Sequence, residues 1–158
     1  MKHQQYQPVF VSSDKLQFNF TSIGPKGAIK KVICFSQTEN PDIFNMTLGN
    51  LTEHGAVDYN TTIDNKDRNA ILTTAKESVY TFTSHYPDKS VFYKGNTIEK
   101  TRLYRMALTR FFDELKNDFE IFGVLGQGIG FFAENFVAGK EYFGFLLKRK
   151  NIFHATAS

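Results

Sequence analysis

The feature that most constrains this fold is a change of hydrophobic period near residue 60. Before it, apolar and polar side chains alternate, as in Leu16-Gln17-Phe18-Asn19-Phe20, which is typical of a half-buried strand. Gly24-Pro25-Lys26-Gly27 is a strong turn signal, so the apolar segment 28–36 is predicted to return as the second strand of a hairpin. Further strands are expected at 43–48 and 56–59. The first sixty residues therefore predict an antiparallel meander.

Two helices are predicted after this point. The first is expected to be capped by Asp64 or Asn65 and to end at Pro87, soon after Tyr86. It shows apolar residues spaced by three and four, at Ile71, Ala75, Val79 and Phe82. The second is expected from about Ile98 to Asn117, with Asn96 or Thr97 as its N-cap, after a short strand at 90–93.

Apolar segments at 119–124, 131–136 and 142–150 predict two or three further strands, with a short helix near Glu141 as the alternative. The fold class is therefore α+β, with an antiparallel β-meander or curved sheet and two main helices packed on one face. The chain has 158 residues and a mass of 18.1 kDa, which suits a single domain over 1–158 with an ordered core of about 5–150.

Composition restricts the environment and the partners. The net charge of +3 and the pI near 8.9 permit an anionic partner without requiring one. The single Cys34 lies in an apolar run and is expected to be a small buried hydrophobe. No signal-peptide pattern and no run of 18 apolar residues is visible, so we expect a cytoplasmic protein that does not enter a membrane.

The sharpest candidate site lies where the 90–93 strand gives way to the second helix. Helix N-termini present free N–H groups and a partial positive charge, so nearby cations can complete an anion site. Arg102 and Arg105 are three residues apart and share a helix face. The candidate anion- or nucleic-acid-binding residues here are Lys94, Lys100, Arg102 and Arg105. The alternative is a solvated face with ion pairs to Glu99 and Asp113.

A second basic group ends the last predicted strand, with Lys148 and Arg149 as further candidate binding residues. The alternative is that these charges protect a sheet edge from pairing with another edge. If the basic groups converge, aromatic side chains of the sheet would give them a stacking platform for single strands. The rings considered for it are Phe18, Phe20, Phe35 and Phe44, most of which are expected to fill the core.

Other chemistry finds little support. The spacing of Gly126, Gly128 and Gly130 is one residue short of the dinucleotide fingerprint and is better explained by a hairpin turn. None of the four histidines has a partner at the spacing of a helical metal site. We therefore predict no catalytic residue, no metal and no cofactor.

Three stretches together resemble a known family. They are residues 20–31 (FTSIGPKGAIKK), 101–106 (TRLYRM), and 139–142 (GKEY) with the closing 145–150 (FLLKRK). The set resembles a family of small uncharacterised bacterial proteins catalogued only as a domain of unknown function, over about residues 5–150. The resemblance implies that the basic segment 101–106 is a family feature, and it implies no activity or cofactor.

Three functions remain open. The first is a non-enzymatic binding module for nucleic acid or another polyanion. The second is a protein-interaction component, such as a toxin–antitoxin or phage-defence partner or an obligate homodimer, because 24 aromatic rings in 158 residues exceed the ordinary needs of one core. The third is a small phosphoryl- or nucleotide-processing enzyme with His85 or Tyr104 as the proton carrier.

Overall fold

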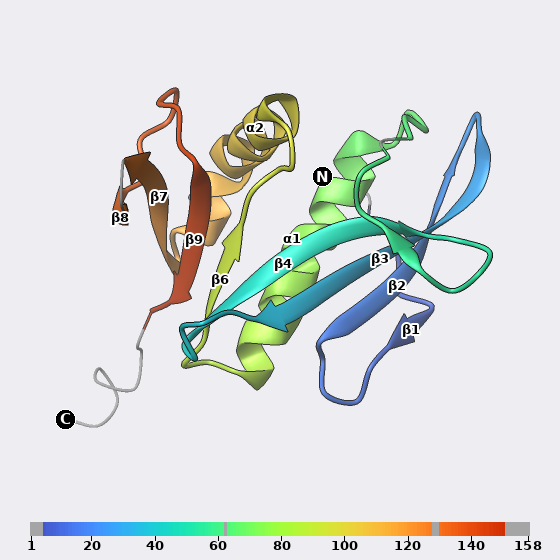
Figure 1. Cartoon of the computed structure of the whole chain (residues 1–158), viewed down its shortest axis with the longest axis horizontal. Coiled ribbons are helices and arrows are strands. Elements are labelled where there is room, and N and C mark those ends of the chain that lie inside the picture. The colour runs from blue at the N-terminus through green and yellow to red at the C-terminus, as the bar shows by residue number, and fades with distance from the viewer. Residues whose placement is uncertain (1–4, 62, 128–129, 151–158) are drawn as a thin grey trace. The chain divides into compact units, whose positions relative to one another are not determined.

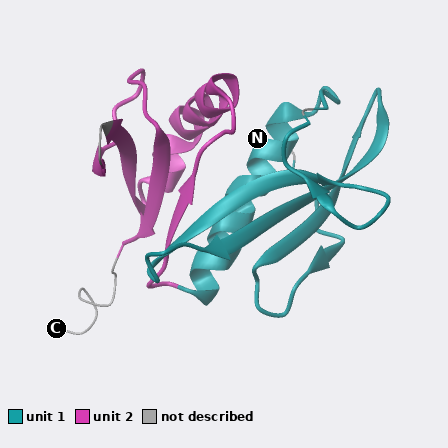
Figure 2. Ribbon diagram, viewed as in Figure 1, with its two compact units in different colours: residues 1–86 teal, residues 87–158 magenta. Residues whose placement is uncertain are grey.

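The computed structural model of the chain describes residues 5–61, 63–127 and 130–150. The chain divides into two compact units, residues 1–86 and 87–158 (Figure 2). Each unit combines antiparallel strands with one long helix (Figure 1), which confirms the predicted α+β class. The single domain expected from the chain length stays a prediction, because a division into compact units does not measure how they fold.

The strands of the first unit form the predicted meander. They are β1 (Phe10–Val11), β2 (Gln17–Gly24), β3 (Gly27–Gln37), β4 (Ile43–Leu51) and β5 (Val57–Asp58), each paired antiparallel with the next. Gly24 pairs with Gly27 across the β2–β3 turn, and Gly27 has a φ of 92°, a conformation that only glycine adopts without strain. Strand β1 was not predicted, because two residues are too few to show a period.

The helix of this unit, α1 (Arg68–His85), packs on the meander through aromatic rings. The fully buried Phe82 stacks on Phe35 with ring centroids 4.4 Å apart, and Phe44 lies 5.2 Å from it. Phe18 and Phe20 are buried as well. All four rings considered above for a stacking platform therefore belong to the core, and none of them is available to a ligand.

The expected cap of the first helix is wrong. The N-cap is Asp67, and neither Asp64 nor Asn65 takes that place. Asn65 is 1% exposed and braces the β2–β3 turn, because its amide group donates to the Gly27 carbonyl at 2.9 Å and accepts from the Lys26 N–H at 2.7 Å. Asn65 therefore satisfies backbone groups across the turn, which would be costly to leave without partners in a buried position.

The second unit builds its sheet in a different order. It contains β6 (Ser90–Tyr93), α2 (Ile98–Leu115), β7 (Phe119–Gln127), β8 (Gly130–Asn135) and β9 (Gly144–Arg149). Strand β9 lies between β6 and β7, and β8 pairs with β7, so the order is β6-β9-β7-β8 with all neighbours antiparallel. The β7–β8 pairing agrees with the predicted hairpin, although Gly128 of its turn lies outside the described residues.

Helix α2 supplies the other half of this unit's core. Its buried residues are spaced by three and four along the helix, and Tyr104 and Phe112 add ring contacts to Tyr93 and Phe136. The helix side of the core consists of Leu108, Phe111 and Leu115. The strand side includes Val91, Tyr93, Phe119, Ile121, Phe145 and Leu147.

Two further predictions concern the burial of Cys34 and the absence of a membrane-spanning helix. Cys34 is half-buried rather than fully buried, its thiol sulfur lies 3.8 Å from the Tyr59 hydroxyl, and burial raises the pKa of the thiol. Over the part of the chain that the structure describes, neither helix is long and apolar enough to cross a membrane.

Candidate anion-binding pocket

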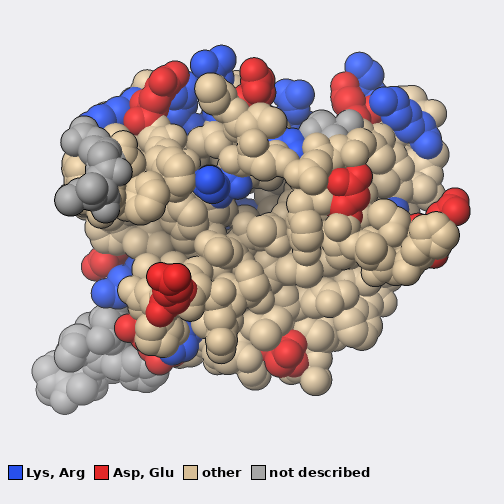
Figure 3. Space-filling model, in the orientation of Figure 1, with Lys and Arg blue, Asp and Glu red and all other residues tan. Residues whose placement is uncertain are grey.

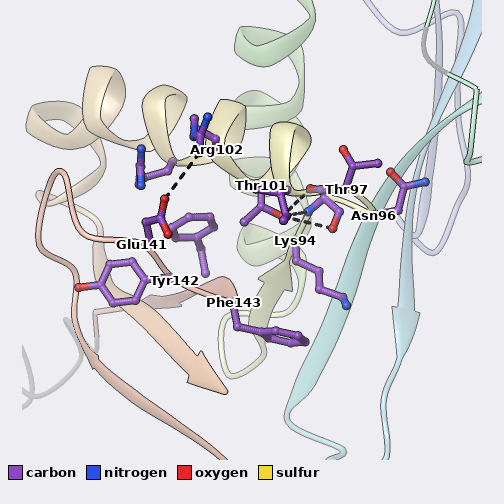
Figure 4. Close-up of a pocket in the computed structure, with 12 residues that line it drawn as sticks. Lys94, Asn96, Thr97, Thr101, Arg102, Glu141, Tyr142 and Phe143 are labelled. Carbon is purple, nitrogen blue, oxygen red and sulfur yellow. Dashed lines mark hydrogen bonds and ion pairs between the residues drawn. The ribbon is translucent and has the colours of Figure 1, made fainter. Parts of the chain in front are cut away.

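A pocket of about 450 Å³ opens in the second unit between the end of β6, the first turns of α2 and the segment that leads into β9 (Figure 4). Its volume lies in the range of ordinary small-ligand sites. The pocket is lined by Lys94, Gly95, Asn96, Thr97, Ile98, Thr101, Arg102, Arg105, Glu141, Tyr142, Phe143 and Phe145.

The pocket exists because Gly95 brings the end of β6 against the first turn of α2. A Cβ at Gly95 would lie 2.3 Å from the Lys100 Cβ and 2.5 Å from the Thr101 nitrogen, so only a residue without a side chain fits. Thr101 fastens the contact: its Oγ1 accepts from the Gly95 N–H at 3.0 Å and lies 3.2 Å from the Gly95 carbonyl oxygen. The strand end and the helix start are therefore held together by one tight contact.

The start of α2 is built as the sequence predicts. Thr97 is the N-cap, and its hydroxyl accepts from the Lys100 N–H at 3.1 Å. Glu99 lies in the first turn, where the partial positive charge of the helix end stabilises a carboxylate. Because Thr97 and Ile98 line the pocket, that positive end borders the cavity.

Three cations of the predicted set meet at this pocket. Lys94 extends past the Phe143 ring with its Nζ 4.4 Å from the ring centroid, a cation–π distance (Figure 4). Arg102 lies 3.7 Å from Glu141 in an exposed ion pair. Arg105 lines the same pocket, as expected from its spacing to Arg102. Among the described residues no carboxylate pairs with Lys94 or Arg105, so the pocket carries two positive charges in excess.

The wall opposite α2 is held in place by Tyr142. Its hydroxyl donates to Glu134 at 2.9 Å and accepts from the Val137 N–H at 3.0 Å, while Lys140 pairs with the same carboxylate at 2.6 Å. The hydrogen bond from Lys140, together with that from Tyr142, lowers the pKa of Glu134. The ring of Tyr142 lies where a Cβ of Gly123 would be. This network fixes the loop that presents Glu141 and Phe143.

The remaining predicted residues do not join the pocket. Lys100 does not line it, and its Cβ packs against Gly95 instead. Lys148 lies at the other end of β9, opposite Glu120 of β7, and Arg149 covers the Phe119 ring at 5.0 Å. Strand β9 pairs with both β6 and β7, so Lys148 does not protect a sheet edge as the alternative expected. Its place opposite Glu120 agrees instead with a cross-strand pair of opposite charge, which stabilises a sheet.

Sequence reasoning missed the two other groups that shape the pocket, Glu141 and Phe143. Both come from about 40 residues further along the chain than the start of α2. The order β6-β9-β7-β8, which brings the start of β9 beside the end of β6, has no local sequence signal. The one available signal is the pair of glycines, Gly95 and Gly144, because a glycine at a strand end often marks a close approach.

The groups proposed for proton transfer lie elsewhere. Tyr104 packs edge-on against Tyr93 with centroids 5.7 Å apart, and burial raises its pKa. It does not line the pocket, and His85 belongs to the first unit. In the described part of the chain, no group of three His, Cys, Asp or Glu side chains is arranged to hold a metal ion.

Fold and site together define a small α+β protein with a basic, aromatic-walled pocket at a strand-to-helix junction. A family model matches residues 2–150 of the chain. The chain therefore belongs to a family of unknown function, DUF6934, in agreement with the resemblance noted in the sequence. No curated protein and no solved structure matches it.

Proposed function

We propose that this protein is a non-enzymatic binding module for nucleic acid or another polyanion. The observation that carries the proposal is the meeting of Lys94, Arg102 and Arg105 at one pocket beside the N-terminus of α2. Charges spread over a surface are normally solvated and act singly, whereas charges around a cavity act on the same ligand. Helix N–H groups add to the attraction for a phosphate.

Glu141 sets the strength of this site. Its carboxylate neutralises Arg102 in an exposed pair, and such pairs are worth about 0.2–1 kcal/mol. A phosphate that enters the pocket must displace Glu141 from Arg102 and experiences repulsion from it. Glu141→Gln is therefore expected to tighten binding by up to about fivefold.

The test is fluorescence anisotropy with labelled single-stranded RNA, single-stranded DNA and duplex DNA as the polyanions. Three phosphate contacts predict that affinity for a single strand falls about 20-fold between about 50 and 200 mM salt, since each contact contributes about −0.7 to the log–log slope. The double variant Arg102→Glu/Arg105→Glu leaves one contact. It should lose about tenfold or more in affinity at low salt, and its salt loss should shrink to about threefold.

The matched control is Arg110→Glu/Lys116→Glu. Both residues are exposed, Arg110 on α2 and Lys116 at its C-cap, and neither lines the pocket. The change in net charge is the same. Equal loss of binding in both double variants would show that net charge alone attracts the ligand. Binding that is independent of salt would refute the proposal.

A second candidate function, protein interaction, is favoured by one specific observation. Strand β8 pairs with β7 on one side, and it carries Phe131 and Phe132 at 65% and 50% exposure. Val137, just after the strand, is exposed as well. Exposed large apolar side chains on an edge strand are a feature of surfaces that take up another chain.

Its test is the oligomeric state by sedimentation at rising protein concentration, for the native chain and for Phe132→Lys. A charge at an edge strand prevents edge pairing, so a dimer that forms through β8 should dissociate in the variant. A protein that stays monomeric at high concentration would count against a homodimer, and a pull-down that retains nothing would count against a separate partner.

A further inference from the structure

Phe143, which lines the uncharged side of the pocket, belongs to an aromatic cluster that extends beyond the pocket. The ring of Phe143 lies 4.7 Å from that of Phe131 and 6.3 Å from that of Phe92, with interplanar angles of 30° and 25°. Phe131 is 65% exposed and Phe143 is 38% exposed, although the same unit buries Phe119 and Phe145 almost completely. The cluster is therefore apolar surface that the core leaves outside.

Glycines in the sheet let these rings pack directly against the backbone. Phe131 of β8 pairs with Gly126 of β7, and a Cβ on that glycine would lie 3.0 Å from the Phe131 ring. Gly144, at the start of β9, leaves room for Phe92, whose ring would lie 2.5 Å from a Cβ there. Glycine inside a strand weakens it, and it often marks a place where a group must approach the backbone closely. Here the group is an aromatic ring.

Positive charge lies beside the rings rather than apart from them. The Lys94 ammonium is 4.4 Å from the Phe143 centroid, and Phe143 lines the same pocket as Arg102 and Arg105. In the space-filling view, the face of the second unit that is turned to the viewer is mainly uncharged, with charged groups of both signs at its borders (Figure 3). A nucleotide carries its charge on one side of the sugar and its base on the other, so a cation and an exposed ring next to each other can bind both parts of one nucleotide.

From this juxtaposition we infer that the pocket binds single-stranded nucleic acid, with phosphates on Lys94 and the two arginines and an unpaired base stacked on the Phe131–Phe143 cluster. A duplex keeps its bases stacked inside and offers them no access to a ring, whereas single strands bind to aromatic side chains beside basic grooves. The inference rests on the proposed polyanion-binding function and names its ligand class.

Two alanine variants test the stacking contribution. Phe131→Ala and Phe143→Ala should each weaken binding of a labelled oligonucleotide of about 12 residues by on the order of tenfold. The slope with salt should not change, because no cation is removed. Binding of a duplex of the same length should be unaffected. The RNA and DNA oligonucleotides, measured in parallel, show which of the two single-stranded nucleic acids binds more tightly.

The matched control is Phe132→Ala. Phe132 is on the same strand and similarly exposed, but successive side chains of a strand point to opposite faces, so it should leave binding unchanged. Phe143→Leu keeps the apolar bulk and removes the aromatic face, and it should weaken binding as Phe143→Ala does. That variant keeps the test valid if the alanine variant folds poorly.

A direct readout comes from the absence of tryptophan in the chain. Phe131→Trp introduces a single indole on the cluster, and a stacked base should quench its fluorescence with the same midpoint as the anisotropy. If single strands and duplexes bind equally, with salt dependence but without effect of the phenylalanine variants, the polyanion function stands and the stacking inference is refuted. If no nucleic acid binds, both fail, and a protein partner at the aromatic cluster is the explanation to pursue.

Discussion

The contact between Gly95 and the first turn of α2 makes the sharpest structural prediction. In Gly95→Ala the new Cβ would have to occupy a position 2.3 Å from the Lys100 Cβ and 2.5 Å from a backbone nitrogen. A backbone atom of a helix cannot move aside as a flexible side chain does, so the strand end must move away from α2. The two Gly95–Thr101 hydrogen bonds, at 3.0 and 3.2 Å, are then lost.

The magnitude follows from these contacts. A hydrogen bond between neutral groups contributes about 1 kcal/mol, and forcing an extra carbon into a packed site costs about 1–3 kcal/mol. We expect Gly95→Ala to lower the free energy of unfolding by about 3–5 kcal/mol. Thr101→Val, which keeps the volume and removes only the hydroxyl, should cost about half as much. Both should also weaken polyanion binding, because Lys94 moves with the strand end.

The assay is urea unfolding followed by far-ultraviolet circular dichroism, with anisotropy for binding. The control is Gly130→Ala, because a Cβ there meets no atom within 4 Å and should change stability by less than about 0.5 kcal/mol. The reasoning is refuted if Gly95→Ala is as stable as the native chain, or if the two glycine variants are equally destabilised.

Two other changes test the supports around the sites. Asn65→Ala removes a buried amide that serves the Lys26 N–H and the Gly27 carbonyl, and it should cost about 3 kcal/mol in thermal or urea unfolding; a change below about 0.5 kcal/mol would contradict it. The hydrogen bond from Lys140 is the main reason that the pKa of Glu134 in the folded protein lies below 4.5. The ionised Glu134 therefore contributes its full stability to the fold above pH 4.5, and this contribution is lost as the pH falls through the pKa of the folded state. Native stability should therefore decline on acidification below about pH 4.5 more than that of Glu134→Gln.

Most elements could be predicted because their signals are local. The β2–β3 hairpin follows from the alternation before Gly24 and from the turn residues after it, and α2 begins at Ile98 because Thr97 caps it. The predicted N-cap of α1 was wrong because Asn65 could serve either as a helix cap or as a brace for a turn. A side chain that prefers caps also hydrogen-bonds readily across turns, and only the fold shows that the β2–β3 turn lies within its reach.

The candidate pocket also has a part that the local sequence predicts and a part that it does not. Its charges lie within twelve consecutive residues, 94–105, so helical spacing alone could place Arg102 and Arg105 together. Lys148 was grouped with them only by charge. Its distance from the pocket is set by its register, because it lies opposite Glu120 three residues beyond Phe145 along β9. Composition does not contain that information.

The exposure of the aromatic cluster depends entirely on which strands pair and in which register. The alternation around Phe18 and Phe20 predicts that they share one buried face, but no local pattern predicts that Phe131 and Phe143 are exposed, as they are. What separates the two pairs is the neighbour across the sheet. Phe18 and Phe20 face α1 and its core. Phe131 belongs to the edge strand β8 and lies over Gly126 of the neighbouring strand β7. The arginine variants and the Phe131 variant therefore probe separate parts of the site, whereas Phe143 is in contact with Lys94 at 4.4 Å. The positive charges come from one contiguous segment, and the rings are assembled by the pairing of β7 and β8 and the start of β9. A ligand that responds to both kinds of variant must contact both parts, which is the behaviour expected of a nucleotide and not of a simple anion.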